Sequence, residues 1–176
     1  MHKGQRRPLS LGSTDFSALR SAGEIYVDKT GMLYELARER SKIFLSRPRR
    51  FGKSLLISTF ESLFSYGLRD FNGLTIDKYW KDTGAYTVVK LDFSAVSDFS
   101  TAEEFELWFS QYLFDYLEAH KLQSPIKNTT DGFRLFSAWL RVQPANSLVL
   151  LIDEYDAPLT LNWAKSVRRI RQFLTR

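Results

Sequence analysis

The chain has 176 residues, of which 44% are hydrophobic and 15% aromatic, and it contains no cysteine. Its length and apolar content exclude general disorder, and the lack of cysteine excludes disulfides and thiolate metal sites. Lysine and arginine number 25 against 20 aspartates and glutamates, and this net charge of +5 permits an anionic partner without requiring one.

No apolar run approaches the roughly 20 residues that a membrane-spanning helix needs. The N-terminal residues 1–8 are basic, but no apolar segment typical of a secretory signal follows them. Cysteine-free composition fits a reducing compartment. We therefore expect a single cytoplasmic domain without a membrane partner.

The first half of the chain predicts two helices on either side of a short strand. Residues 30–40 and 53–66 place apolar side chains at helical spacing, and Gly67 is typical of a helix end. The apolar run within residues 42–46 predicts a buried strand between them. Residues 71–80 are expected to be irregular and to contain a turn.

The second half alternates strands with helices, predicted over residues 86–93, 101–120, 131–142, 147–152 and 162–176. Thr101 and Glu104 form a capping-box pattern at the start of the long helix. Alternation of this kind favours a mainly parallel sheet covered by helices on both faces. In such α/β sheets ligands bind at the carboxyl ends of strands, where both chemical motifs of this chain lie.

The first motif is a phosphate-loop pattern at residues 47–54, Arg-Pro-Arg-Arg-Phe-Gly-Lys-Ser, between a predicted strand and a helix. It matches G-x-x-x-x-G-K-[ST] except that Arg47 replaces the first glycine. Gly52 allows the backbone to approach phosphates, and the amides that follow it point at an anion from a helix N-terminus. Lys53 can reach the β- and γ-phosphates, and the Ser54 hydroxyl can ligate Mg²⁺.

Arg47 tolerates positive φ less well than glycine, and Pro48 has no N–H group, so we expect the loop to offer fewer amides to the phosphates. Arg49 and Arg50 can compensate through charge-assisted hydrogen bonds. An incidental basic turn is the alternative interpretation of this segment. The residues expected to bind nucleotide are Arg49, Arg50, Phe51, Gly52, Lys53, Ser54 and Leu55.

The second motif is the apolar strand at residues 147–152, which ends in Asp153 and Glu154. Carboxylates at the end of a buried strand need a cation or strong hydrogen bonds. Beside a phosphate loop, Asp153 is expected to hold Mg²⁺ together with Ser54, and Glu154 to act as the general base that polarises the attacking water. The alternative is a strand that simply meets a polar turn.

Several other features have two interpretations each. Asp28 either caps the helix that follows it or lies near the nucleotide. Asp92 is either a turn residue or supports the residues that contact the ligand. The basic residues near the C-terminus, from Lys165 to Arg176, form either a solvated helix face or a contact to a nucleic-acid backbone. The aromatic row along residues 105–116 indicates core packing or a partner groove.

The chain resembles the N-terminal domain of the predicted AAA-ATPase-like proteins of bacteria, which often carry a C-terminal nuclease-like domain of the PD-(D/E)XK class. The matching stretches are Tyr-Val-Asp-Lys-Thr at 26–30, the run at 44–55, Phe-Asn-Gly-Leu at 71–74, Leu-Asp-Phe-Ser at 91–94 and Leu-Ile-Asp-Glu-Tyr-Asp at 151–156. Arg47 is this family's own variant of the loop. The resemblance implies a P-loop NTPase-like three-layer sandwich that binds ATP and Mg²⁺.

The same resemblance implies that a further strand, carrying a polar sensor residue, follows the acidic strand. No such strand is predicted after Asp156, so we expect the fold to be incomplete at its C-terminus. We expect ATP and Mg²⁺ binding, with hydrolysis in the complete protein and nucleotide acting as a switch for an effector domain. The alternative is a non-enzymatic module that keeps the ATPase shape and binds DNA, RNA or protein.

Overall fold

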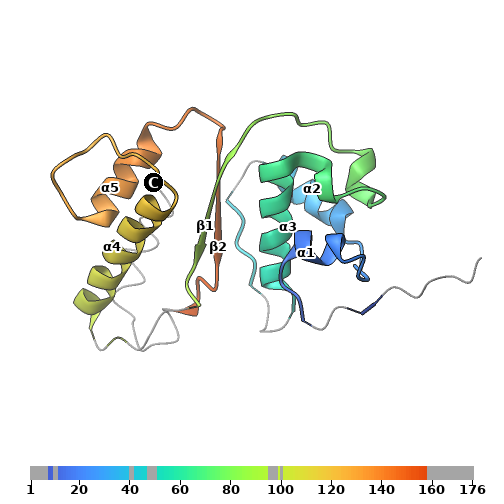
Figure 1. The fold of residues 1–176 in the computed structure, drawn as a ribbon, viewed down its shortest axis with the longest axis horizontal. Coiled ribbons are helices and arrows are strands. Elements are labelled where there is room, and N and C mark those ends of the chain that lie inside the picture. Colours follow the sequence, from blue (N-terminus) through green and yellow to red (C-terminus); the bar gives the residue numbers. More distant parts are fainter. Residues whose placement is uncertain are drawn as a thin grey trace, which may run out of the picture. The chain divides into compact units, whose positions relative to one another are not determined.

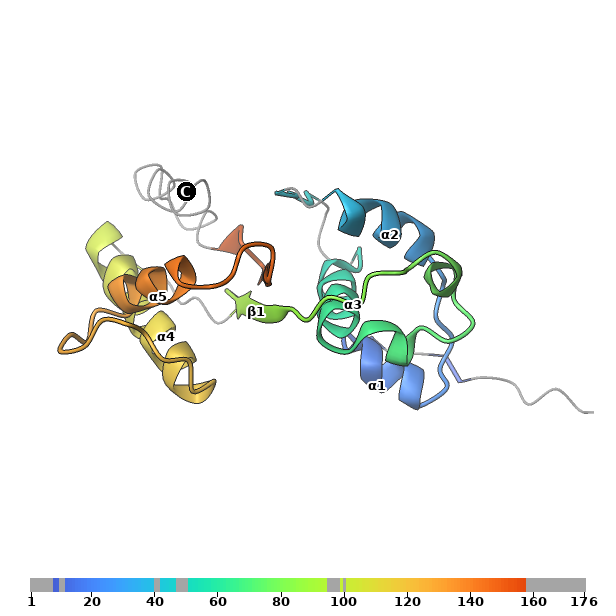
Figure 2. The same cartoon turned by 90° about the horizontal axis from the view of Figure 1, so that it is seen from above.

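The computed structural model describes residues 8–9, 12–39, 42–46, 51–94, 99 and 101–157. These residues form two compact units, each built from two stretches of the chain. The first unit contains the described residues up to Leu91 together with Ser147–Asp153, and the second contains those from Asp92 to Asn146 and from Glu154 onward. Their helices and strands are labelled in Figure 1, and Figure 2 shows the same cartoon from above. Within the described residues, no helix has both the length and the apolar content to cross a membrane.

The described helices of the first unit are α1 (Phe16–Ser21), α2 (Thr30–Arg38), α3 (Lys53–Tyr66) and the 3₁₀ turns η1 (Gly67–Asp70) and η2 (Thr75–Lys78). The structure confirms the two helices expected at 30–40 and 53–66. The sequence did not predict α1, because six residues are too few for helical periodicity to be recognised. The segment expected to be irregular contains η2.

A cluster of buried apolar side chains joins these helices, and Phe16 and Phe71 are both completely buried at its centre. Their ring centroids lie 4.8 Å apart. Full burial of one such side chain contributes about 1.5–3 kcal/mol to stability. The buried members of the cluster are Phe16, Leu33, Leu63, Phe71, Leu74, Ile76 and Trp80.

Helix α3 also buries three hydroxyl side chains, Ser58, Thr59 and Ser62, which we call the hydroxyl stripe. Ser58 Oγ accepts a hydrogen bond from the backbone N–H of Phe16 at 2.9 Å, which ties α1 to α3. Thr59 Oγ1 donates to the backbone oxygen of Leu55 at 2.7 Å. Because an unpaired buried polar group costs about 1–3 kcal/mol, these bonds keep the stripe compatible with burial.

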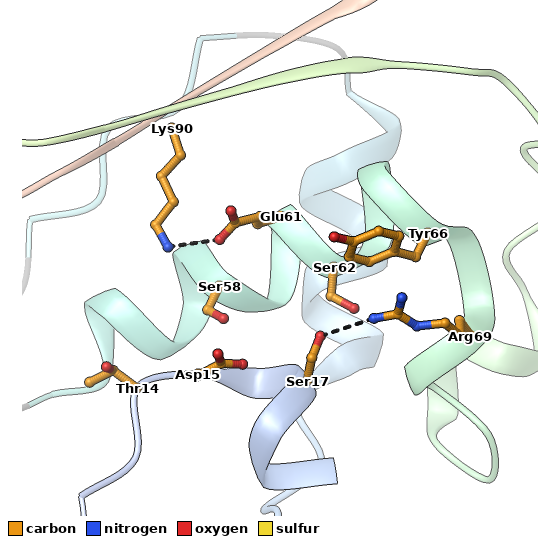
Figure 3. A pocket seen from close by; sticks show the side chains of 9 residues that line it. All are labelled: Thr14, Asp15, Ser17, Ser58, Glu61, Ser62, Tyr66, Arg69 and Lys90. Atoms are coloured by element: carbon orange, nitrogen blue, oxygen red, sulfur yellow. Dashed lines mark hydrogen bonds and ion pairs between the residues drawn. The ribbon is translucent and has the colours of Figure 1, made fainter. Parts of the chain in front are cut away.

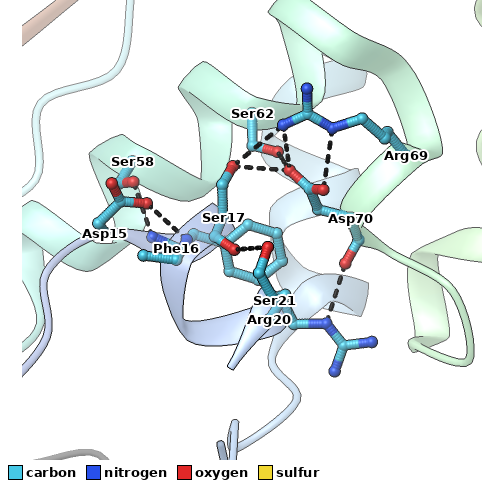
Figure 4. Close-up of polar contacts among 10 residues, drawn as sticks. Asp15, Phe16, Ser17, Arg20, Ser21, Ser58, Ser62, Arg69 and Asp70 are labelled. Atoms are coloured by element: carbon cyan, nitrogen blue, oxygen red, sulfur yellow. Dashed lines mark hydrogen bonds and ion pairs between the residues drawn. The ribbon is translucent and has the colours of Figure 1, made fainter. Parts of the chain in front are cut away.

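The last hydroxyl of the stripe, Ser62, donates to Asp70 Oδ2 at 2.7 Å, and Ser17 of α1 donates to the same oxygen at 2.6 Å. Arg69 donates to both carboxylate oxygens, at 3.0 and 2.8 Å, and Arg20 donates to the Asp70 backbone oxygen at 2.9 Å. Figure 4 shows these contacts. The hydrogen bonds from Arg69, Ser17 and Ser62 hold the pKa of Asp70 well below its usual range. Asp70 thus joins α1, α3 and η1.

Two strands, β1 (Thr87–Asp92) and β2 (Leu148–Asp153), are hydrogen-bonded neighbours and run in the same direction in Figure 1. They confirm the strands expected at 86–93 and 147–152. The backbone N–H of Thr87 donates to the oxygen of Ser147 at 2.7 Å, just before β2 begins. Helix α3 packs against β2. The described residues therefore form an α/β structure with a small parallel sheet.

The strand predicted over residues 42–46 is wrong, because this segment is not a strand in the structure. Ile43 is 45% exposed and Phe44 is 63% exposed, whereas the prediction required burial. A strand needs a neighbour to pair its backbone N–H and C=O groups. The sheet formed by the described residues has two strands, and this segment is not among them.

The second unit contains the helices α4 (Ala102–Ala119) and α5 (Gly132–Arg141), which pack against each other and confirm the helices expected at 101–120 and 131–142. Thr101 and Asp131 cap them, each accepting a hydrogen bond from a backbone N–H three residues on. Gly132 allows the close approach, because a Cβ there would lie 1.9 Å from a backbone oxygen of α4. The helix expected at 162–176 lies outside the described residues.

The aromatic row of α4 packs inside the second unit. Phe105 and Phe109 are buried and stack at 5.7 Å, and Trp108 stacks on Tyr112 at 5.2 Å. The Tyr112 hydroxyl accepts a hydrogen bond from the backbone N–H of Asp92 at 2.9 Å. Burial raises the pKa of that hydroxyl. These contacts support the core-packing interpretation of the row.

Asp28 joins the start of α2 to the start of η2. Its Oδ1 accepts from the N–H and hydroxyl of Thr30, at 2.9 and 2.6 Å, and its Oδ2 accepts from the N–H and hydroxyl of Thr75, both at 2.7 Å. Burial alone would raise the pKa of Asp28, but these hydrogen bonds outweigh it and lower the pKa to about 2. The structure thus supports the capping role of Asp28.

The low pKa of Asp28 predicts a loss of stability in acid. Its ordinary value is 3.8 and its folded value about 2, so the stabilisation is fully present above pH 4 and is lost as the pH falls toward 2. In Asp28→Asn, the free energy of unfolding should be lower at pH 6 and should fall less between pH 4 and 2. Urea unfolding followed by circular dichroism measures this.

The matched control is Asp77→Asn, because Asp77 accepts a single hydrogen bond, at 3.3 Å from Gly73. That variant should keep the acid dependence of the unchanged chain. An equally steep loss of stability in Asp28→Asn would contradict the assigned role of the carboxylate.

Candidate phosphate-binding site

Helix α3 begins directly after Gly52, whose backbone has a φ of 76° in the left-handed region. A residue with a Cβ is strained there, whereas glycine is not. A Cβ at Gly52 would meet nothing within 4 Å, so the glycine is required by its backbone conformation, and the space beside it is open. Lys53 and Ser54 form the first two positions of the helix.

The N-terminus of α3 has no side-chain cap among the described residues. Asp15 caps α1, Thr101 caps α4 and Asp131 caps α5, whereas the N-cap residue of α2, Lys29, makes no such bond either. The first amides of any α-helix have no partner inside the helix, and here the intrahelical bonding begins with the N–H of Leu56, which donates to Gly52 at 3.0 Å. A helix end of this kind suits an anion, because its N–H groups and dipole both favour negative charge.

The predicted binding residues at this end differ in exposure. Phe51 is 63% exposed, Lys53 and Ser54 are half-buried, and Leu55 packs against the buried apolar cluster. The Leu55 side chain therefore belongs to the core, and only its backbone amide could contact a ligand. Arg47, Pro48, Arg49 and Arg50 lie outside the described residues.

The acidic end of β2 lies in the same unit as the start of α3. Asp153 is the last residue of the strand and is only 7% exposed. Helix α3 packs against strand β2. In Figure 1 the first turn of α3 and the arrowhead of β2 lie at the same end of this helix–strand pair. That Ser54 and Asp153 act together stays a prediction.

A Mg²⁺ ion held between phosphates, Ser54 and Asp153 would take most of its ligands from the nucleotide and water. Within the described part of the chain, no group of three or more histidine, cysteine, aspartate or glutamate side chains could hold a metal ion.

Glu154 follows Asp153 and begins the second stretch of the second unit. Its φ of 49° lies in the left-handed region, which is uncommon for a residue with a side chain. The backbone N–H of Ala157 donates to the Glu154 oxygen at 2.8 Å, so a tight turn follows the strand. The polar-turn interpretation therefore holds for the backbone. Strained residues gather at functional sites, which favours a chemical role for the side chain as well.

A polar pocket of about 470 Å³ lies between α1, α3 and β1, and none of the described residues that were predicted to bind nucleotide lines it. Figure 3 shows its lining, in which Lys90 pairs with Glu61 at 2.7 Å. Arg69 lies 3.7 Å over the ring of Tyr66. The lining residues are Thr14, Asp15, Ser17, Ser58, Glu61, Ser62, Tyr66, Arg69 and Lys90. Several of these lining residues also take part in the hydrogen bonds around the hydroxyl stripe.

This network could not be predicted from the sequence, because its members are separated by up to 53 positions. Serines spaced along α3 resemble the solvated positions of an ordinary helix. Asp28, which lies outside this network, did have a local signal, because an aspartate two residues before a threonine is typical of a side-chain turn.

The backbone of Glu154 predicts an unusual response to substitution. Glu154→Gly should be more stable than Glu154→Ala by about 1 kcal/mol, because glycine adopts positive φ without strain while alanine does not. Both variants lose the carboxylate, so their difference reports the backbone alone. Chemical denaturation measures it. A more stable alanine variant would show that the left-handed conformation is wrong.

Known proteins include a family and a relative to which this chain is similar. The family model described as "Predicted AAA-ATPase" matches residues 10–176. An uncharacterized protein in the vnfD 5' region of Azotobacter chroococcum mcd 1 is 29% identical over 172 residues, which cover 96% of this chain and 33% of that protein. The chain thus spans about a third of the length of this curated relative. No solved structure matches. The extent of the family match shows that the chain belongs to the predicted AAA-ATPase family.

Proposed function

We propose that residues 1–176 are the first part of a P-loop domain that binds ATP and Mg²⁺, and that the complete protein hydrolyses ATP. The observation that carries the proposal is the uncapped N-terminus of α3, where Gly52 at positive φ precedes Lys53 and Ser54. Membership of the predicted AAA-ATPase family supports ATP as the nucleotide. A three-layer sandwich is the fold proposed for the complete domain.

The first turn of α3 would bind the phosphates. The backbone amides that follow Gly52 would donate to phosphate oxygens, and Lys53 would neutralise charge on the β- and γ-phosphates. Arg49 and Arg50 would add charge-assisted hydrogen bonds. The exposed ring of Phe51 and the amide of Leu55 complete the proposed contacts.

The end of β2 would supply the remaining chemistry. The Ser54 hydroxyl and the Asp153 carboxylate would hold Mg²⁺, which neutralises charge as it develops on the transferred phosphoryl group. Glu154 would accept a proton from the attacking water. Because Asp153 is buried and Glu154 lies in the turn after it, one short segment would provide both a metal ligand and a base.

Nucleotide would act as a switch for an effector part of the complete protein. The curated relative is about three times as long as the matched region, which leaves room for such a part. The chemistry of the site accounts for the switch, since loss of the γ-phosphate would remove contacts to Lys53 and to the metal.

The proposal predicts that the chain binds ATP in the presence of Mg²⁺ and that Lys53→Ala abolishes this binding. The lysine supplies charge that no neutral side chain replaces. Isothermal titration calorimetry on the unchanged chain and the variant tests it. Lys78→Ala removes the same charge from the exposed surface of η2 and should bind like the unchanged chain.

Two outcomes would count against nucleotide binding. One is a cooperatively folded chain that does not bind ATP, which would favour the alternative of a non-enzymatic interaction module. The other is equal binding by the chain and Lys53→Ala, which would place any nucleotide elsewhere.

A second prediction concerns catalysis by the complete protein. Glu154→Gln should bind ATP with unchanged affinity and lose turnover by about 10²–10⁴-fold, because the amide keeps the shape of the side chain but cannot take a proton. Phosphate release measures turnover. The control is Glu106→Gln on α4, which makes the same chemical change outside the proposed site. Turnover near the unchanged rate in Glu154→Gln would remove Glu154 as the base.

A further inference from the structure

The polar pocket between α1, α3 and β1 is large enough to hold a small molecule. Its volume is about 470 Å³, whereas one water molecule needs roughly 10–15 Å³ on this measure. All of its lining residues belong to the first unit. Figure 3 shows their side chains gathered between α1, α3 and Lys90 of β1. The chemistry of this lining indicates which class of molecule the pocket suits.

Both cations of the lining are already paired with carboxylates. Lys90 Nζ lies 2.7 Å from Glu61 Oε2, and Arg69 Nη2 lies 2.8 Å from Asp70 Oδ2. The other charged side chain of the lining, Asp15, is exposed and caps α1. Because each cation has a carboxylate in contact, little field is left to attract an anion, and solvent screens the exposed aspartate. The pocket therefore favours an uncharged ligand.

The same lining retains hydrogen-bonding groups of both kinds. Ser58 is only 8% exposed, and its oxygen accepts from the N–H of Phe16, but its own proton has no acceptor among the described residues. Within the same part of the chain, no hydrogen bond reaches Glu61 Oε1 or Asp15 Oδ2, since each carboxylate uses its other oxygen. A buried donor without a partner is costly, so water or a ligand must satisfy Ser58.

We propose that this pocket binds a small uncharged molecule rich in hydroxyl groups, of the cyclic sugar or polyol class. A hydroxyl group donates one hydrogen bond and accepts up to two. One such ligand can therefore accept from Ser58 and donate to the open oxygens of Glu61 and Asp15. A phosphate or carboxylate only accepts, and it would lie beside two carboxylates that repel it. The proposal does not depend on nucleotide binding, because the pocket is lined by other residues.

The test is an NMR titration of the isotope-labelled full chain with four neutral probes: D-glucose, D-galactose, D-ribose and myo-inositol. Each is added up to about 50 mM, because a few hydrogen bonds give millimolar affinity. We expect at least one probe to cause saturable shifts of the backbone amide signals of Ser17, Ser58 and Glu61. Gluconate and glucosamine, which add one charge to a similar frame, should bind more weakly than the best neutral probe.

Two variants locate the binding. Thr14→Trp fills the pocket from an exposed position of its lining and should abolish the shifts. Its matched control is Thr83→Trp, which places the same ring at an exposed position outside the pocket and should leave binding unchanged. Ser58→Ala removes the buried donor and should weaken binding by about three- to tenfold, as expected for one hydrogen bond. Since Ser58 also bonds Phe16, a thermal unfolding curve first establishes that this variant folds.

The outcomes decide the proposal in either direction. Saturable shifts that disappear in Thr14→Trp and persist in Thr83→Trp support it. A folded chain that shows no saturable shift with any neutral probe overturns it and leaves the pocket to water. Equal binding by Thr14→Trp would place the ligand elsewhere, and tighter binding of gluconate or glucosamine would overturn the uncharged class. If Ser58→Ala does not fold, the pair of tryptophan variants still decides.

Discussion

The buried hydroxyl stripe of α3 is the constraint on which the first unit depends. Ser58, Thr59 and Ser62 lie in a mainly apolar interior, where an unpaired hydroxyl would be costly. Each is hydrogen-bonded, and two of the three bonds go to other elements, to the backbone of Phe16 in α1 and to Asp70 in η1. Apolar packing draws these elements together, but directional bonds decide where each one sits on α3.

The N-terminus of α3 differs from the rest of the helix. Gly52 has no side chain that could cap α3, whereas Asp15, Thr101 and Asp131 cap α1, α4 and α5 among the described helices. The buried hydrogen bonds of the hydroxyl stripe hold α3 along its length, and the first turn of the same helix carries the lysine and serine of the proposed phosphate site.

At the carboxyl end of β2, two neighbouring acidic residues differ in burial and in backbone conformation. Asp153 is buried at the end of the strand, and Glu154 turns the chain away at positive φ. The first carboxylate is buried, while the backbone of the second residue lies in the left-handed region. A sequence that favoured stability alone would place glycine or asparagine at the second position. The glutamate there is understandable if its side chain is needed for chemistry.

The sequence by itself determined the longer elements and the chemical motifs. The helices α3, α4 and α5 and both strands follow from periodicity and caps such as Thr101, because these signals act within a few residues. Gly52, Lys53 and Ser54 could likewise be recognised from their order. Short α1 escaped notice, since a helix of six residues depends on packing more than on its own pattern.

Only the tertiary structure decided which groups separated in the chain meet. An apolar run such as residues 42–46 does not reveal whether a neighbouring strand exists, and the structure leaves Phe44 exposed. Nor does a serine or aspartate reveal its distant partner, as Asp70 and Ser17 show. Local propensity acts between neighbours along the chain, whereas burial and pairing depend on the whole arrangement, and the polar contacts that position α3 belong to the second kind.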